Sequence, residues 1–460
     1  MPRDAWPIGC RGSTDNLSWW TTSHGRGANQ MSGNISDLHG RYILDSRGNP
    51  TVEVDCFVDG RMISRAAVPS GASTGRHEAV ELRDGGDAWQ GMGVESAVAN
   101  VNGPLSELIV GMNLLDDDAQ PRIDEALLGL CGDSKSQHGA NAVLGISLAC
   151  FKAGAELHGR ALWEHFHAFI AAHADEIGER LPSLPVPMMN ILNGGAHANS
   201  DVDVQEFMVV PHGFDAFETA LHAGVQCYHA LKEELERDGL LTGLGDEGGF
   251  APNLPTNEEG LRYMQRAIGK AGYSTDQIGI ALDVAASEFH RGGLYDFDGR
   301  RITGGELAVI YRQWADDYPL ISIEDPFDED DWESWRLLTA KIGDSCQIVG
   351  DDLYVTQFLR LHQGVQSNAS NSILIKLNQV GTVSETIETM GLAWNSGYTT
   401  VISHRSGETA DTTIADLAVG TGAGQIKTGA PARTDRTAKY NQLLRISESV
   451  NEYAAPFSRS

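Results

Sequence analysis

The sequence predicts an α/β protein with an eight-stranded α/β barrel, of the TIM-barrel kind, in its C-terminal part and a smaller α+β domain before it. Beyond residue 278, short apolar segments recur every 23 to 41 residues and alternate with helical patterns, such as those at 306–317 and 331–341. This alternation is typical of βα units. A proline-rich connector at 181–187 precedes roughly 270 residues, close to the ~250 of a typical barrel. We therefore expect the barrel domain to span residues 181–460.

Residues 38–180 are predicted to form the smaller domain. Apolar and polar residues alternate from residue 41 to 65, and turn sequences at 47–50 and 59–60 divide this stretch into three runs. Asp-Gly between two alternating runs is a strong signal for a hairpin, so the stretch is expected to be an antiparallel meander. From residue 93 the apolar spacing becomes helical. Strands followed by helices indicate an α+β unit.

Residues 1–37 are predicted to form a disordered tail or extension. This stretch is rich in Gly, Ser, Asn and Thr, and it has neither the apolar core nor the cleavage-like sequence of a signal peptide. Met31 is an alternative natural start, in which case the preceding residues come from an upstream start codon or from an added segment.

Charge and composition exclude some classes of function. The formal net charge is −29, from 34 basic and 63 acidic residues, which argues against a nucleic-acid partner because phosphate backbones are bound through an excess of Lys and Arg. No run of about 18 apolar residues is present, so no membrane span is expected. The six cysteines are scattered without a CxxC pair, which favours a reduced, cytoplasmic protein.

Six of the predicted barrel strands end in a polar or charged residue. These residues are Asp283, Glu324, Asp351, Lys376, His404 and Lys427. Because the C-terminal ends of barrel strands face one mouth, these side chains are expected to converge there. Lys376 is the most unusual of them, since it interrupts the apolar run 373–378 and burial of an unpaired ammonium group is costly.

The three acids at successive strand ends, Asp283, Glu324 and Asp351, suit a hard divalent cation, because Mg²⁺ prefers carboxylate oxygens. A structural salt-bridge network is the alternative. Such a network would have arginines that balance the acids, whereas the next strands bring two lysines. Beside a cation, the ammonium groups of Lys376 and Lys427 would each be repelled by neighbouring positive charge. The neutral amine of at least one of them then becomes accessible, as a general base requires.

Other loops are predicted to reach the same rim. His404, Arg405 and Ser406 offer an imidazole, a guanidinium and a hydroxyl group, which together suit a phosphate. The segments 193–197 and 205–207 resemble loops at earlier strand ends. The flexible loop 244–249 carries a carboxyl group that is a candidate general acid, with a solvated turn as the alternative. It matches GxGxxG, but no convincing strand precedes it, so a dinucleotide site is rejected.

These motifs resemble the enolase family, in its bacterial type, and they occur in family order between about residues 40 and 446. The segments that carry the resemblance are Leu44–Thr51, Pro69–Gly75 with His77–Ala79, Asn193–His197, Gln205–Met208, Gly245–Gly249, Ser322–Pro326, Gly350–Leu353, Leu374–Gln379, Ser403–Thr409 and Gln425–Ala430. The resemblance implies an enolase-type barrel with an N-terminal capping domain and a mobile glycine loop. It also implies reversible dehydration of 2-phospho-D-glycerate to phosphoenolpyruvate in glycolysis and gluconeogenesis.

The resemblance also implies roles for individual residues. Lys376 would remove the proton from C2, and Glu247 would protonate the departing C3 hydroxyl group. Two Mg²⁺ ions would bind in each active site, the second arriving with the substrate. The implied metal ligands are Asp283, Glu324 and Asp351 for the first ion and Ser73 for the second. The implied substrate contacts are His197, Gln205, Glu206, His404, Arg405, Ser406 and Lys427.

Two alternatives to this function stay open at this point. Paralogues of enolase act on phosphonates and other analogues of phosphoenolpyruvate, and intact catalytic motifs do not exclude such a substrate. A binding or scaffold protein can also keep the fold without the chemistry, which would show as loss of a ligand or of the base. The resemblance implies a homodimer or an octamer of dimers, located in the cytoplasm, with a secondary presence at the cell surface left open.

Overall fold

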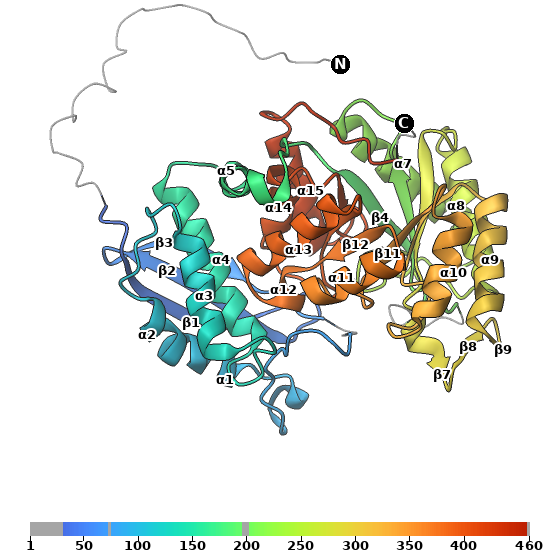
Figure 1. The fold of residues 1–460 in the computed structure, drawn as a ribbon. Helices are drawn as coiled ribbons and strands as arrows, with labels where there is room; N and C mark the ends of the chain where they lie inside the picture. Colours follow the sequence, from blue (N-terminus) through green and yellow to red (C-terminus); the bar gives the residue numbers. More distant parts are fainter. Residues whose placement is uncertain (1–30, 72–74, 196–201, 458–460) are drawn as a thin grey trace, which may run out of the picture.

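The computed structural model describes residues 31–71, 75–195 and 202–457. Figure 1 shows a smaller N-terminal part, in blue and cyan, beside a barrel that holds the rest of the described chain. The N-terminal sheet has the order β1-β2-β3 and is antiparallel throughout. Its strands are β1 (Ile35–Leu44), β2 (Pro50–Val58) and β3 (Arg61–Ala67). The predicted meander is therefore confirmed.

The first strand begins earlier than the sequence suggests. Residues 35–37, which the sequence pattern places in the tail, belong to β1. Ile35 is almost fully buried, and its backbone pairs with Val58. The side chain of Ser32 donates to Asp59 at 2.6 Å, so the chain is attached even before the strand begins. A single apolar residue among polar ones gives no periodic signal, which is why the pattern did not mark this start.

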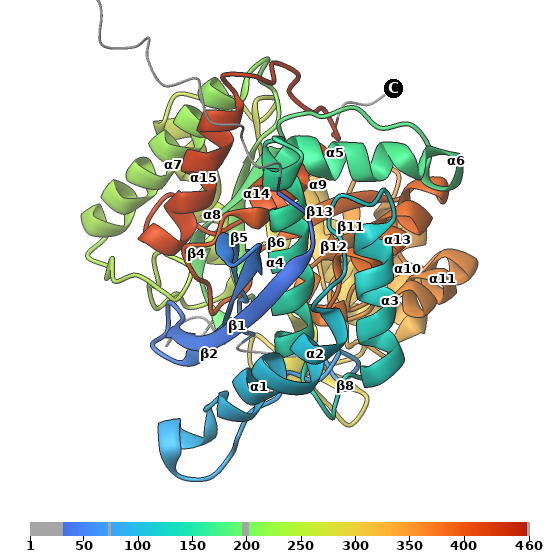
Figure 2. The same cartoon turned by 90° about the vertical axis from the view of Figure 1, so that its left-hand side faces the viewer.

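The helices of the N-terminal part are α1 (Glu95–Asn100), α2 (Ser106–Ile109), α3 (Ala119–Cys131), α4 (Ala140–Leu157), α5 (Leu162–Ala172) and α6 (Ala174–Ile177), with the short segments η1 (Ala88–Gly91) and η2 (Val101–Leu105). Of these, α1, α2 and α4 pack on the sheet, whereas α5 and α6 lie away from it, against helices of the barrel (Figure 2). Gly145 lets α4 approach the sheet closely, because a Cβ there would lie 2.7 Å from Val54. Among the described helices, only α4 is long and apolar enough to cross a membrane, and 83% of it is buried inside the protein, as in the core helix of a globular domain.

Eight strands form a closed barrel, which confirms the predicted fold class. They are β4 (Val186–Asn193), β5 (Glu206–Pro211), β6 (Ile278–Asp283), β10 (Leu320–Glu324), β11 (Gln347–Gly350), β12 (Ser372–Ile375), β13 (Thr399–Ser403) and β14 (Gln425–Lys427). The helices of this part are α7 (Phe217–Arg237), α8 (Asn257–Lys270), α9 (Gly304–Asp317), α10 (Trp332–Ile342), α11 (Phe358–Ser367), α12 (Leu377–Val380), α13 (Val383–Asn395), α14 (Thr413–Gly420) and α15 (Thr434–Ile446). A small sheet follows β6 through the short helix η4 (Ala286–Phe289) and contains β7 (His290–Arg291), β8 (Leu294–Phe297) and β9 (Arg300–Ile302).

One barrel strand runs against the others. β5 pairs antiparallel with both β4 and β6, whereas the other strand pairs are parallel. The connection 194–205 is short, and antiparallel neighbours need no crossover helix. β5 therefore begins at the mouth where its neighbours end, and this brings Gln205 and Glu206 to the rim from the start of a strand.

The N-terminal part docks on the loop that follows β13 at the mouth of the barrel. The backbones of Ser70 and Gly407 exchange two hydrogen bonds, of 2.7 and 2.9 Å. On α4, Lys152 Nζ lies 2.6 Å from Asp411 Oδ2, and the backbone N–H of Ala67 donates to the same oxygen at 3.2 Å. Burial raises the pKa of Asp411, but the charge of Lys152 and hydrogen bonds from Thr413 outweigh it and lower the pKa to about 2.

We expect Asp411→Asn to lower the free energy of unfolding by about 2.5 kcal/mol at pH 6, because a fall in the pKa from 3.8 to about 2 corresponds to roughly that energy. The folded-state pKa is the lower one, so this contribution is present above about pH 4 and is lost as the pH falls toward 2. Urea denaturation at several pH values measures it. Asp344→Asn, at an exposed position, is the control. A difference that persists unchanged down to pH 2 would contradict the prediction.

Candidate active site

The described mouth of the barrel holds a small polar cavity of about 30 Å³. It is lined by Gln205, Glu206, Glu247, Asp283, Ala285, Asp325, Asp351, Asp352, Lys376, His404, Arg405, Ser406 and Lys427. Its side chains come from strand ends, from the start of β5 and from the loop between α7 and α8. The convergence expected from the sequence is thus seen in the structure.

Lys427, the last residue of β14, reaches across the mouth to the acids of β6 and β10. Its Nζ lies 2.8 Å from Asp283 Oδ2, 2.9 Å from both oxygens of Glu324 and 3.3 Å from Glu206 Oε2. The side chain is 3% exposed. Burial lowers its pKa, but the carboxylates around it raise the pKa well above the usual value. Gln205 contacts one of these acids, because its Nε2 donates to Asp283 Oδ2 at 3.4 Å. Lys427 is therefore a buried cation held by three acids.

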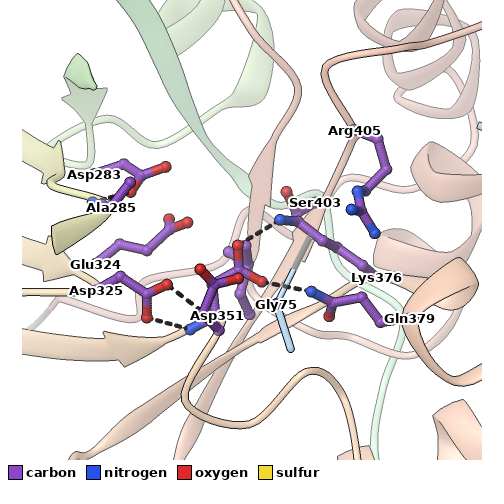
Figure 3. Close-up of polar contacts among 12 residues, drawn as sticks. Gly75, Asp283, Ala285, Glu324, Asp325, Asp351, Lys376, Gln379, Ser403 and Arg405 are labelled. Atoms are coloured by element: carbon purple, nitrogen blue, oxygen red, sulfur yellow. Dashed lines mark hydrogen bonds and ion pairs between the residues drawn. The ribbon is translucent and has the colours of Figure 1, made fainter. Parts of the chain in front are cut away.

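Lys376 directly follows β12, and its Nζ donates to Asp351 Oδ2 at 2.5 Å. The second oxygen of Asp351 accepts from Gln379 Nε2 at 2.8 Å. Figure 3 shows Asp351 between Asp325 on one side and Lys376 with Gln379 on the other. Burial lowers the pKa of Lys376, but the charge of Asp351 outweighs it, so the net shift is upward. In this arrangement the side-chain amine of Lys376 is protonated.

Glu247 and His404 lie next to each other in the same cavity. Glu247 is 2% exposed, so the loop that carries it is not a solvated turn. Its Oε2 accepts from Asn190 Nδ2 at 3.1 Å and lies 3.2 Å from His404 Nε2, a contact that is close but not aligned as a hydrogen bond. Burial lowers the pKa of His404 to about 4, so the ring is neutral at pH 7.

Arg405 connects the mouth to the N-terminal part. Its Nη1 and Nη2 donate to the two oxygens of Glu78 at 2.9 and 3.2 Å, and Nη1 also donates to Asn378 Oδ1 at 3.0 Å. The arginine is 3% exposed, and Ser406 beside it is also buried. A glutamate from the smaller domain thus orients the guanidinium group predicted to bind a phosphate.

Several residues at or beside this mouth were not predicted from the sequence. Asp325 accepts from the backbone N–H groups of Asp351 and Asp352 at 2.9 and 2.8 Å, as Figure 3 shows for Asp351. It does so with a positive φ of 42°, a strained conformation for a residue other than glycine. These acids could have been predicted, because the sequence has the pairs Glu-Asp and Asp-Asp at the ends of two strands. Glu78 and Arg436 gave no such signal, because each resembles a solvated charge in its own segment.

Two predicted site residues, Ser73 and His197, lie outside the described residues. The other predicted residues line the cavity or, in the case of Glu324, contact Lys427 within it.

The donor set fits Mg²⁺. Seven buried or nearly buried carboxyl groups meet three side-chain cations, Lys376, Arg405 and Lys427. These acids are Glu206, Glu247, Asp283, Glu324, Asp325, Asp351 and Asp352. Burial and the neighbouring charge of Asp283 raise the pKa of Glu324 well above its usual value, a crowding of negative charge that a divalent cation would relieve.

The three acids predicted to hold the first ion are separated in this structure by their lysine partners. Two clusters of possible metal ligands are found within the described residues, and in each of them the ligand atoms all lie within 4.8 Å of one another. One cluster is Asp325, Asp351 and Asp352, and the other is Glu206, Glu247 and His404. Asp283 and Glu324 contact Lys427, while Asp351 contacts Lys376.

Two family models match the chain. One describes the N-terminal domain of enolase and matches residues 35–166, and the other describes its C-terminal TIM barrel domain and matches residues 182–458. The first match begins where β1 begins, and the second includes all eight barrel strands. Since the two matches cover most of its length, the chain belongs to the enolase family and is a lyase of the enolase superfamily.

Proposed function

We propose that this protein is a phosphopyruvate hydratase, which reversibly dehydrates 2-phospho-D-glycerate to phosphoenolpyruvate. Its family implies a Mg²⁺-dependent lyase that binds phosphoglycerate or phosphoenolpyruvate. The observation that carries the finer proposal is the position of Lys376 and Glu247, which line one cavity from different elements. A base and an acid on separate elements suit removal of a proton from C2 and loss of a hydroxyl group from C3.

Asp283, Glu324 and Asp351 would hold the first Mg²⁺, and Ser73 would help to hold the second. Bound Mg²⁺ supplies positive charge that stabilises the extra negative charge on the substrate carboxylate after C2 loses its proton. Lys427 adds a fixed positive charge beside two of these acids, on the side of the mouth that would receive that carboxylate. A proton next to a carboxylate is barely acidic, so this concentration of charge is essential to the reaction.

Lys376 takes the proton from C2 in this mechanism, and it must first be neutral. Burial lowers its pKa, as do the charges of Arg405 and Lys427, whereas the charges of Asp351 and Glu324 raise it. The protonation of the base is therefore set by burial and by the balance of charges within the cavity. Glu247 then protonates the C3 hydroxyl group, the C3–O bond breaks and water leaves. Asn190 fixes the orientation of the Glu247 carboxyl group.

Arg405 and Ser406 are proposed to bind the phosphate group, while His197, Gln205, Glu206 and His404 line the pocket. Arg405 already shares both terminal nitrogens with Glu78, so the guanidinium plane is fixed before a ligand arrives. Fixing the donor in advance reduces the ordering that binding would otherwise require.

The proposal predicts that the protein converts 2-phosphoglycerate to phosphoenolpyruvate only in the presence of Mg²⁺. Ultraviolet absorbance of the product measures the rate, EDTA should abolish it, and added Mg²⁺ should restore it. Phosphonate analogues belong in the same assay, because turnover of one of them in place of 2-phosphoglycerate would assign the protein to a specialised paralogue. Folded protein with no metal-dependent signal on any of these substrates would instead favour a scaffold role.

We further propose a cytoplasmic homodimer or octamer. The described cysteines are all free, which supports a reducing compartment. Light scattering coupled to size-exclusion chromatography would measure the oligomeric state.

A further inference from the structure

Arg436, in the first turn of α15, is a fully buried cation to which the proposed reaction assigns no role. Its Nη1 donates to His404 Nδ1 at 2.6 Å and to the backbone oxygen of Arg405 at 2.7 Å. Its Nη2 donates to the backbone oxygens of Ser406 at 2.7 Å and Asp246 at 3.3 Å. The guanidinium group thus joins the loop after β13 to the loop between α7 and α8, the two loops that supply the histidine and the acid of the site.

The loop before α15 is shaped to admit this side chain. Gly429 has a positive φ of 81°, and a Cβ there would lie 2.8 Å both from Cδ of Arg436 and from the backbone oxygen of Glu247. The next residue, Ala430, donates its backbone N–H to that same oxygen at 3.0 Å. Asp435 lies 2.8 Å from Nε of Arg436 and offsets its charge. Glycine at this position therefore lets the arginine and the Glu247 loop pack directly together.

The contact at His404 determines which ring nitrogen carries the proton. A guanidinium group has donors only, so His404 Nδ1 must be the acceptor and cannot be protonated. In a neutral ring the proton is then on Nε2, which lies 3.2 Å from Glu247 Oε2. Low solvent exposure and the positive charge of Arg436 both disfavour the imidazolium form.

We propose that Arg436 is a positioning residue that holds His404 as a neutral imidazole with its proton on Nε2. Because that nitrogen carries a hydrogen, it cannot take a proton from Glu247 and can only donate toward it. The proton of Glu247 is thereby kept for the departing C3 hydroxyl group. This inference rests on the proposed function for its catalytic consequence, but the state of the imidazole is testable without any substrate.

The first test reads the tautomer directly in the wild-type protein. Protein labelled with ¹⁵N only in histidine is examined by long-range ¹H–¹⁵N correlation between pH 6 and 8, and His404→Gln identifies the signal. We expect an unprotonated Nδ1 and a protonated Nε2 over the whole range. A protonated Nδ1, or an imidazolium ion at pH 7, would overturn the proposal, and this outcome does not depend on whether any variant folds.

The second test changes the donor. Arg436→Met should allow both tautomers, lower kcat ~10- to 100-fold with a smaller change in KM, and move the ionisation of His404 upward in the pH profile of kcat, because one nearby positive charge is lost while burial persists. The charged and titratable groups that face His404 are Glu247, Glu206, Lys427 and Arg436 itself. Only the last of them changes in this variant.

Two further variants separate positioning from folding. Arg436→Lys keeps a donor and should recover part of kcat, whereas Arg445→Met, at an exposed position on the same helix, should change nothing. Loss of kcat in Arg436→Met with an unaltered tautomer and pH profile would mean a merely structural role and would overturn the proposal. A wild type with the expected tautomer but no turnover of 2-phosphoglycerate would refute the proposed function and leave the Arg436–His404 assignment standing.

Discussion

Replacing Lys376 by alanine is expected to lower the turnover of 2-phosphoglycerate by ~10²-fold or more, the usual effect of losing one proton-transfer group. Lys376 lines the cavity from the end of β12, and its partner Asp351 keeps a second hydrogen bond, from Gln379, when the lysine is removed. The fold should therefore survive the change. Initial rates at saturating Mg²⁺ measure the loss, and circular dichroism checks the fold.

Lys341→Ala is the matched control, because Lys341 is exposed on α10 and does not line the cavity. It should retain wild-type turnover. Exchange of the C2 proton with deuterated solvent gives a second measurement, since a missing base should abolish exchange along with net dehydration. Turnover like that of the wild type in Lys376→Ala would remove this residue from the role of base.

Lys427→Met is expected to lower the free energy of unfolding of the metal-free protein by ~3–5 kcal/mol, the usual effect of removing one partner of a buried ion pair. Methionine fills a similar volume but leaves Glu206, Asp283 and Glu324 without the cation that lies among them. Mg²⁺ can replace part of that charge. Added Mg²⁺ should therefore stabilise the variant more than it stabilises the wild type.

Thermal denaturation in EDTA and in excess Mg²⁺ measures both effects. Lys439→Met is the control, because Lys439 is equally buried but pairs with Glu408 and two backbone oxygens away from the predicted metal ligands. It should lose stability without a comparable recovery in Mg²⁺. Equal Mg²⁺-induced shifts in melting temperature for the wild type and Lys427→Met would show that the lysine and the ion do not share the same acids.

The strand ends could be predicted because each combines an apolar run with one incompatible polar residue. Asp283, Lys376 and Lys427 each break such a run, and the structure places them at one mouth. The direction of β5 could not be predicted, because all its residues are buried and an apolar run does not encode which way it points. Only the short connection before it, which leaves no room for a crossover helix, hints at the reversal.

The partners of the site residues were harder to predict than the residues themselves. Arg436 lies in a helix with a polar sequence, where an arginine normally faces solvent, and its burial depends on a tertiary contact with Gly429. Glu78 reaches Arg405 from more than 300 positions earlier in the chain. Contacts of this kind come from domain docking, and the local pattern of a single sequence does not record them.

The order in which the barrel closes bears on how the protein is made. Closure joins β14 to β4 through Gln425 and Val186, so a ribosome must deliver nearly the whole chain before the sheet can seal. Until then the nascent protein carries two unpaired strand edges, and the acids of β6 and β10 lack the ammonium group of Lys427. The last segments synthesised pair these edges, neutralise these acids and add α15. A chain cut short before residue 425 would therefore have two unpaired strand edges, and its acids would lack the neutralising lysine.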